Sequence, residues 1–236
     1  MMAKQQTASK QLRQQILDLG ASLAGFADLR GVAPPEFSRW PNAVSIALRL
    51  DPAVIAGVRD GPTREYYEEY KCVNRGLNEL ASKTADLISS LSHRAEPYPA
   101  TIVDRSQREE FETTLSVPFQ HKTAATRAGL GWIGKSALLV TPEYGPRVRL
   151  VTVFTDMPLD VGVAITAGRC GDCRACVVAC PAGAIKGHGW KIGVAREELV
   201  DAWACRAKAK QLMLARVGLE DSVCGACMAV CPVGME

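Results

Sequence analysis

Eight of the nine cysteines lie close together, between positions 170 and 231 of a 236-residue chain. The first four, Cys170, Cys173, Cys176 and Cys180, are separated by two, two and three residues, and Pro181 follows them. A second run places Cys224, Cys227 and Cys231 before Pro232. Thiolates repeated at such short intervals can surround a soft metal centre. The spacing therefore predicts metal–sulfur chemistry.

The first run has the C-x2-C-x2-C-x3-C-P register of bacterial two-cluster ferredoxins, in which the fourth cysteine binds the neighbouring cluster. The second run lacks one ligand, because Asp221 stands where its first cysteine would be. Cys205, between the runs, completes a set of eight. We therefore predict two 4Fe-4S clusters that carry low-potential electrons. One is expected on Cys170, Cys173, Cys176 and Cys231, and the other on Cys180, Cys205, Cys224 and Cys227.

The alternatives for these cysteines are a pair of structural zinc sites or a set of disulfides. Zinc accepts four thiolates but does not require this register. Disulfides fit poorly with a chain that shows no export signal. Cys72 lies apart in a helical pattern, and we expect it to be a small buried residue.

Composition argues against several partners. The 28 basic residues nearly balance 25 acidic ones, which gives a formal charge of +3. Such a balance provides no general attraction to nucleic acid or to a membrane surface. No run of eighteen apolar residues occurs, so we expect a soluble, cytoplasmic protein without a membrane partner.

Hydrophobic periodicity predicts the elements before the cysteines. Helical spacing marks residues 8 to 19 and 63 to 91, whereas alternation marks strands at 43 to 50, 137 to 141 and 147 to 155. The second half of the last strand is apolar on both sides, so both of its faces should be covered. These interleaved elements predict a mixed domain, α+β or α/β, over residues 1–160.

Residues 161–236 have a different texture, with eight cysteines, short loops and one predicted helix at 194 to 216. The segment contains too little apolar sequence to fold without its metal. We expect a small double 4Fe-4S, ferredoxin-like domain here.

Several motifs outside the cysteines resemble a known family. Ala128-Gly-Leu-Gly-Trp-Ile-Gly-Lys135, the stretch from Leu138 to Pro146 and Thr155-Asp-Met-Pro-Leu159 are similar to elements of the epoxyqueuosine reductases. The Tyr-Gly-Pro and Thr-Asp-x-Pro-Leu elements resemble the related reductive dehalogenases equally. The resemblance implies a nitroreductase-like domain that holds cobalamin and a two-cluster domain that feeds it electrons from a donor such as a ferredoxin or flavodoxin.

Six residues are the candidates for contacts with such a cofactor. Gly129 and Gly131 would let a turn approach a flat ring, and Trp132 would supply a packing face. Lys135, Arg147 and Arg149 could meet carboxamide or phosphate oxygens. The alternative is a tight turn with Trp132 in the core and solvated basic residues. The three histidines, His93, His121 and His188, are expected to be surface or cap residues and not metal ligands.

Two departures from the family bear on the reaction. Leu115 takes the place of the aspartate thought to donate a proton, while the pair Val103-Asp104 lies about eleven residues earlier, and no catalytic residue is identified. The sequence also ends soon after Pro232, without the helical-repeat (HEAT-repeat) region by which the tRNA-modifying enzymes hold tRNA, so tRNA is not an expected partner. Three hypotheses follow: a reductase of an unidentified small substrate, an electron-transfer or reactivation partner of a corrinoid protein, and a minimal epoxyqueuosine reductase.

Overall fold

The computed structural model describes residues 2–102 and 105–235, and the chain forms two compact units. Unit 1 comprises Met1–Leu48, Val73–Leu130 and Arg149–Ile165. Unit 2 comprises Arg49–Cys72, Gly131–Val148 and Thr166–Glu236. The two units therefore alternate along the sequence. The expected division into domains 1–160 and 161–236 stays a prediction.

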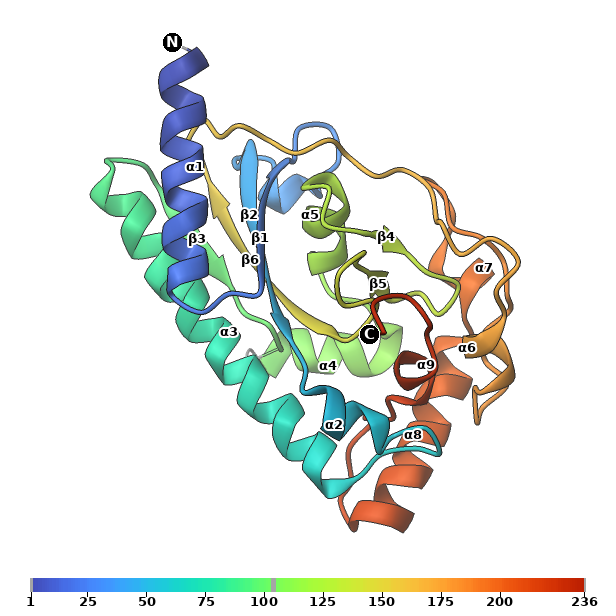
Figure 1. The fold of residues 1–236 in the computed structure, drawn as a ribbon. Helices are drawn as coiled ribbons and strands as arrows, with labels where there is room; N and C mark the ends of the chain where they lie inside the picture. Colours follow the sequence, from blue (N-terminus) through green and yellow to red (C-terminus); the bar gives the residue numbers. More distant parts are fainter. Residues whose placement is uncertain (1, 103–104, 236) are drawn as a thin grey trace. The chain divides into compact units, whose positions relative to one another are not determined.

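Unit 1 is built on a four-stranded sheet with the order β1-β2-β6-β3 (Figure 1). The strands are β1 (Leu23–Asp28), β2 (Asn42–Arg49), β3 (Ala95–Tyr98) and β6 (Val148–Thr155). β1 pairs antiparallel with β2, so that Leu23 faces Ala47, and β3 pairs antiparallel with β6, so that Ala95 faces Thr155. The predicted strands at 43 to 50 and 147 to 155 are confirmed.

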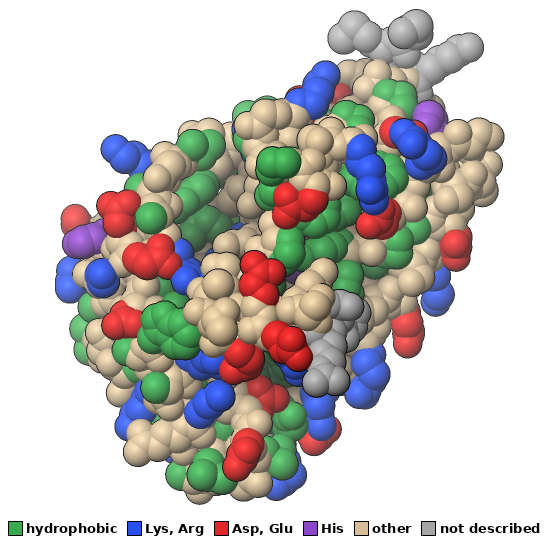
Figure 2. Space-filling view, turned by 180° about the vertical axis from the view of Figure 1, so that it is seen from behind, with side chains coloured by type: hydrophobic (Ala, Val, Ile, Leu, Met, Phe, Trp, Pro, Cys, Tyr) green, Lys and Arg blue, Asp and Glu red, His purple; other side chains and the backbone are tan. Residues whose placement is uncertain are grey.

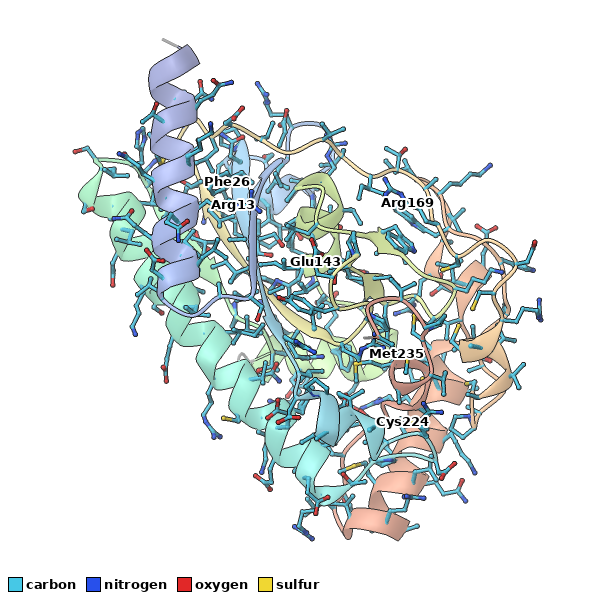
Figure 3. All side chains as sticks on the ribbon, in the orientation of Figure 1. Arg13, Phe26, Glu143, Arg169, Cys224 and Met235 are labelled. Carbon is cyan, nitrogen blue, oxygen red and sulfur yellow. The ribbon has the colours of Figure 1, made fainter. Side chains whose placement is uncertain are left out.

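Helices cover both faces of this sheet. Figure 1 shows α1 (Met2–Asp18) and α3 (Arg64–Ser90) on one side and α5 (His121–Arg127) on the other. Leu12 and Ile16 of α1 are fully buried, as is Val153 of β6, while Phe26 of β1 is 5% exposed (Figure 3). Residues 151–155 are all buried, as their two-sided apolar pattern predicts. The mixed α/β fold class is thus confirmed.

The 3-10 turn η1 (Pro35–Phe37) and the helix α4 (Arg105–Thr114) complete unit 1. The short helix α2 (Pro52–Ala56) belongs to unit 2. The rings of Phe37, Tyr98, Phe119 and Phe154 pack together in unit 1, with centroids 4.8 to 6.0 Å apart. On the face that Figure 2 shows, acidic and basic side chains are interspersed, as the balanced composition suggests.

Unit 2 contains, besides α2 and the start of α3, a two-stranded hairpin and the helices that follow it. The hairpin strands are β4 (Trp132–Ile133) and β5 (Leu139–Val140), and the helices after it are α6 (Ala175–Val178), α7 (Arg196–Leu199), α8 (Ala202–Val217) and α9 (Ala226–Ala229). Trp132 pairs with Val140. α6 and α9 pack against each other, and α2 packs against α9.

Two predictions about helices are wrong. The predicted helix at 194 to 216 is two helices, because Val200 is extended and the Asp201 carboxylate caps α8 by accepting a 2.9 Å hydrogen bond from the Ala204 N–H. Cys72 is exposed and not buried, because it lies on the outer side of α3, whose inner side carries Val73 and Leu77.

Candidate metal centre

The first cysteine run forms a tight loop that leads into α6. The Cys173 N–H donates to the Cys170 carbonyl at 3.1 Å, and Gly171 between them has a positive φ of 51°. A residue with a side chain would be strained there. Beyond α6, the Ala184 N–H donates to the Cys180 sulfur at 3.4 Å. The backbone of this run therefore forms tight turns around the thiols, and one of its N–H groups donates to a cysteine sulfur.

The second run repeats this arrangement around α9. Gly225, with a φ of 89°, precedes the helix. A Cβ at this position would lie 2.9 Å from the Val58 side chain and 3.0 Å from the Tyr66 ring. Cys224, Cys227 and Cys231 are thus held against residues from 49–72, a distant segment of the same unit.

The thiols that act on one another's pKa values can be compared with the predicted ligand sets. Burial raises the pKa of Cys176, and the neighbouring Cys170, Cys231 and Cys173 raise it further. These four are called site I.

Burial likewise raises the pKa of Cys205, and Cys180, Cys224 and Asp201 raise it further. Burial raises the pKa of Cys227, and Cys224, Cys205, Cys176 and Cys180 raise it further, so a thiol of site I also acts on it. Cys180, Cys205, Cys224 and Cys227 are called site II. The ligand assignment stays a prediction, but the thiols that it requires lie together.

This donor set fits an iron–sulfur cluster. Thiols whose pKa is raised by burial, as those of Cys176, Cys205 and Cys227 are, make poor isolated thiolates, and they become stable thiolates when a metal compensates their charge. Among the described residues, no three His, Cys, Asp or Glu side chains converge on the position of a single metal ion. The register of the first cysteine run is the feature that favours a polynuclear centre over the zinc alternative.

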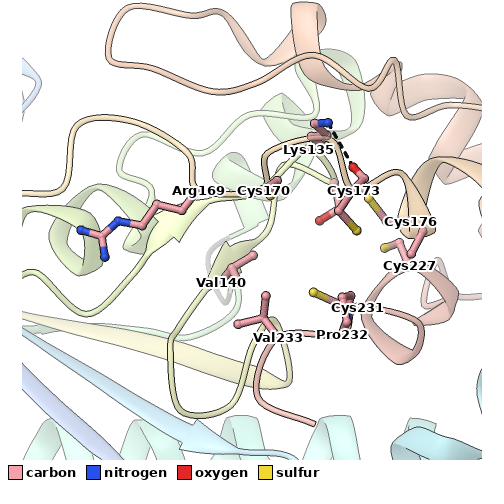
Figure 4. A pocket seen from close by; sticks show the side chains of 13 residues that line it. Lys135, Val140, Arg169, Cys170, Cys173, Cys176, Cys227, Cys231, Pro232 and Val233 are labelled. Carbon is pink, nitrogen blue, oxygen red and sulfur yellow. Dashed lines mark hydrogen bonds between the residues drawn. The ribbon is translucent and has the colours of Figure 1, made fainter.

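A pocket opens onto site I (Figure 4). Its lining includes the thiols of Cys170, Cys173, Cys176, Cys227 and Cys231, together with hairpin residues Gly134, Lys135, Ser136 and Val140. Figure 4 shows Arg169 pointing away from the cysteines, and its guanidinium carbon lies 5.7 Å from the centre of the Trp132 ring. A Cβ on Gly134 would lie 2.8 Å from the Val140 side chain, so the close packing of the hairpin is what requires this glycine beside the Cys170 sulfur.

Asp221 forms its hydrogen bonds with Ser222 and Tyr67. Its carboxylate accepts a 2.6 Å hydrogen bond from the Ser222 N–H. Burial raises the pKa of Tyr67, and a hydrogen bond with Asp221 raises it further. The residue that replaces the missing cysteine thus interacts with α3, which leaves Cys205 as the partner for site II.

Two of the predicted cofactor contacts bind the cysteine loops. The Lys135 ammonium donates to the carbonyls of Gly171 at 2.7 Å and Cys173 at 3.0 Å. The Arg147 guanidinium donates to the carbonyl of Cys231 at 2.9 Å and also to that of Val233. Both side chains are buried, at 8% and 7% exposure. The two cationic groups are therefore not solvated, and the N–H groups that form these hydrogen bonds are not available to a ligand.

The other four candidates also contact the protein. A Cβ on Gly129 would lie 2.8 Å from the Val163 carbonyl oxygen, and one on Gly131 would lie 2.3 Å from that of Val140. Trp132 is 5% exposed in the hairpin, and its Nε1 finds no acceptor among the described residues. Arg149 donates to the Asn74 amide oxygen at 3.0 Å. The close approaches that require glycine are thus made by the chain's own backbone.

Leu115, at the place of the family's aspartate, is buried and has a positive φ of 51°. Its N–H donates to the Phe111 carbonyl at 2.8 Å, which ends α4. A leucine is strained in this conformation, whereas Asp and Asn tolerate it well. Val103 and Asp104 lie outside the described residues.

Among the histidines, His121 is neither a surface nor a capping residue. Its ring lies between the Thr152 hydroxyl, 2.8 Å from Nδ1, and the Pro99 carbonyl, 3.0 Å from Nε2. Since a carbonyl only accepts, Nε2 carries the proton. Burial lowers the pKa of His121 to about 4. His188 is exposed, and His93 lies beside Asp156 at 3.7 Å.

Comparisons with known proteins agree with this arrangement. Residues 169–234 match the family model described as "4Fe-4S double cluster binding domain". The chain is 46% identical over 159 residues to epoxyqueuosine reductase of Listeria monocytogenes, covering 67% of this chain and 40% of the relative. It is 31% identical over 153 residues to that of Pseudomonas aeruginosa, covering 60% and 38%. It thus spans about two fifths of the curated relatives that it matches.

Solved structures share the fold. The catabolic reductive dehalogenase NpRdhA matches with a TM-score of 0.72 at 20% identity, over 98% of this chain and 32% of that chain. An epoxyqueuosine reductase with a modified tRNA stem loop matches with a TM-score of 0.62 at 20% identity, over 97% and 65%. None of the helices in the described residues is long and apolar enough to cross a membrane. The chain is therefore an iron–sulfur protein with a double 4Fe-4S cluster binding domain and is similar in sequence to the epoxyqueuosine reductases.

Proposed function

We propose that this protein is an oxidoreductase in which two 4Fe-4S clusters pass low-potential electrons to a bound cofactor, cobalamin, for the reduction of an unidentified substrate. The double cluster domain and the likeness to epoxyqueuosine reductases support the redox part. A structural neighbour whose title describes B12-dependent dehalogenation supports the choice of cofactor. The proposed setting is the cytoplasm, with a ferredoxin or flavodoxin as donor.

The observation that carries this proposal is that the fold match extends over 98% of the chain. A simple electron carrier needs little more than its cluster-binding segment, whereas here the likeness includes the sheet and helices of unit 1. Electrons on the clusters therefore have an acceptor to serve. We propose that unit 1 helps to hold or recognise that acceptor.

Four of the six residues predicted to contact a corrinoid make close contacts within the chain. Gly129 and Gly131 face backbone carbonyls, and Lys135 and Arg147 donate to the cysteine loops. Leu115 cannot transfer a proton. A corrinoid bound by this chain would depend on other residues, and its chemistry would be to deliver electrons to the substrate.

Anaerobic purification followed by iron, sulfide, cobalt and flavin analysis tests the proposal. We expect about eight irons per chain, together with binding of added cobalamin seen as a change in its absorption spectrum. A protein that contains two intact clusters but binds neither cobalamin nor flavin would contradict the proposal that it is an enzyme.

That second outcome would favour an electron-transfer or reactivation partner of a corrinoid protein. The engagement of Lys135 and Arg147 within the chain and the leucine at position 115 favour this alternative. It predicts that the reduced clusters are reoxidised by a separate corrinoid protein. Turnover of a small substrate with an artificial reductant and no partner would argue against it.

A minimal epoxyqueuosine reductase is the third candidate, favoured by the 46% identity to the Listeria protein. Anaerobic complementation of a strain that lacks the enzyme, with queuosine in tRNA as the readout, tests it. Absence of queuosine despite assembled clusters would exclude this activity, and with it tRNA as a partner.

A further inference from the structure

Lys135 and Arg147 are buried cations that lie at one of the two cysteine sites. Lys135 holds the loop of Cys170 and Cys173, and Arg147 holds the loop of Cys231. Both loops belong to site I. The two cations approach this site from the β4–β5 hairpin and from the residue just before β6.

Within residues 2–102 and 105–235, no acidic side chain forms an ion pair with either cation. Among the described residues, the salt bridges involve other pairs, and the acceptors of Lys135 and Arg147 are main-chain carbonyls. A buried charge without a counter-charge is costly. Four thiolates give a 4Fe-4S cluster a net negative charge, so a cluster in site I would supply the missing compensation.

The surroundings of site II carry no such excess of buried positive charge. The Asp201 carboxylate caps α8 one turn before Cys205, and the Cys205 N–H donates to the Asp201 carbonyl at 3.0 Å. Burial raises the pKa of Cys224, and the nearby Arg216 opposes that rise. Arg216 is exposed, so solvent screens its charge. Asp201 and Arg216 are thus the charged side chains that act on the pKa values of Cys205 and Cys224, one acidic and one basic but screened.

We propose that Lys135 and Arg147 are positioning residues that hold the loops of site I and give its cluster a higher reduction potential than that of site II. Their positive charges stabilise the reduced cluster, which carries one more electron, over the oxidised one. Charge and hydrogen bonding near a cluster are the protein's main means of adjusting its reduction potential. In a low-dielectric interior the effect is larger than at the surface.

The consequence is a direction for electron flow. When the protein takes up one electron, that electron rests on the cluster of site I, since that cluster has the higher potential. Site II accepts from the external donor and passes the electron to site I. The step oxidises the reduced cluster of site II, reduces that of site I and requires no proton. This ordering is independent of the final acceptor.

A redox titration of the full chain with both clusters, followed by electron paramagnetic resonance, tests the proposal. We expect two transitions. Lys135→Met and Arg147→Gln should each lower the upper transition and leave the lower one in place. Lys135→Arg and Arg147→Lys keep the charge and should restore a nearly unchanged upper transition. Lys83→Met, a change of an exposed lysine of α3 outside the cysteine segment, should move neither.

Asp201→Asn provides a second arm that preserves the helix cap, because an asparagine oxygen can still accept from Ala204. Removing this negative charge beside Cys205 should raise the lower transition alone. This arm decides the order of the two sites even if a neutral Lys135 or Arg147 variant fails to assemble its cluster. A rise of the upper transition, or no shift of the lower one, would overturn the proposal.

Discussion

Cys205 is the residue on which the second cluster depends. It lies in the first turn of α8, and it groups with Cys180 and Cys224. We expect Cys205→Ala to remove the cluster of site II and leave that of site I, so that about four of eight irons remain. Iron and sulfide analysis after anaerobic purification measures this.

The ninth cysteine offers a matched control for that change. Cys72 is exposed on α3, apart from both sites. Cys72→Ala should therefore keep all the iron. Retention of all iron in the Cys205 variant would instead point to Asp221 or an external ligand.

His121 makes the stability of unit 1 depend on pH. Because burial lowers its pKa to about 4, the unfolded chain, with a histidine pKa near 6.5, binds a proton that the folded chain excludes. Stability is therefore lost as pH falls below about 6.5, by about 2 kcal/mol between pH 7 and pH 5. Denaturant unfolding of His121→Gln should show a shallower pH dependence than the parent by this amount. Equal slopes would contradict the buried neutral ring.

The functional residues could be predicted from the sequence only where they form a local pattern. The cysteine spacing is a local signal, so a double-cluster segment was predictable, whereas the assignment of ligands across the two runs stays a prediction. Lys135 and Arg147 form bonds that span 36 to 86 positions, and no local pattern reveals such partners. Glycines 129 and 131 were correctly associated with a close approach, but the sequence does not reveal that the approaching atoms are backbone carbonyls of this chain.

At the scale of elements, the periodic segments were the predictable ones. α3 and β6 follow their apolar patterns almost to the residue. β1 was missed as a strand because Gly25 interrupts its pattern, and the structure shows why glycine is needed: a Cβ there would lie 2.9 Å from Leu130. The break before α8 depended on reading Asp201 as a cap, and the apolar periodicity concealed it.

At the end of α8, the effect of backbone conformation on stability can be measured apart from side-chain contacts. Gly218 closes the helix with a φ of 74°, and its N–H donates to the Met213 and Leu214 carbonyls. A Cβ there meets no atom within 4 Å, so Gly218→Ala should cost about 1 kcal/mol through backbone strain alone. Chemical denaturation of the cluster-loaded protein measures it. Gly218→Asn should cost less, and a larger loss for Asn than for Ala would refute the assignment.

For the whole molecule, the metal should matter to one unit more than to the other. Unit 1 has an apolar core of sheet and helices, whereas much of unit 2 is cysteine loops and short helices around two sites that need compensating charge. We expect removal of iron to increase amide exchange strongly over residues 166–235 and little over β1, β2 and β6. Mass spectrometry of exchange before and after anaerobic chelation tests this. Uniform loss of protection would show that the two units unfold together.

The cysteine-rich segment depends on contacts with earlier parts of the chain. Its loops are held by Lys135 and Arg147, and Gly225 fits against Val58 and Tyr66, all from stretches that precede it by many positions. A fragment beginning near residue 161 would contain every cysteine ligand and lack these supports. Gene fusions that transplant the segment alone should therefore yield poorly assembled clusters. Recombination can exchange this centre between proteins only when three separate stretches of the gene move together.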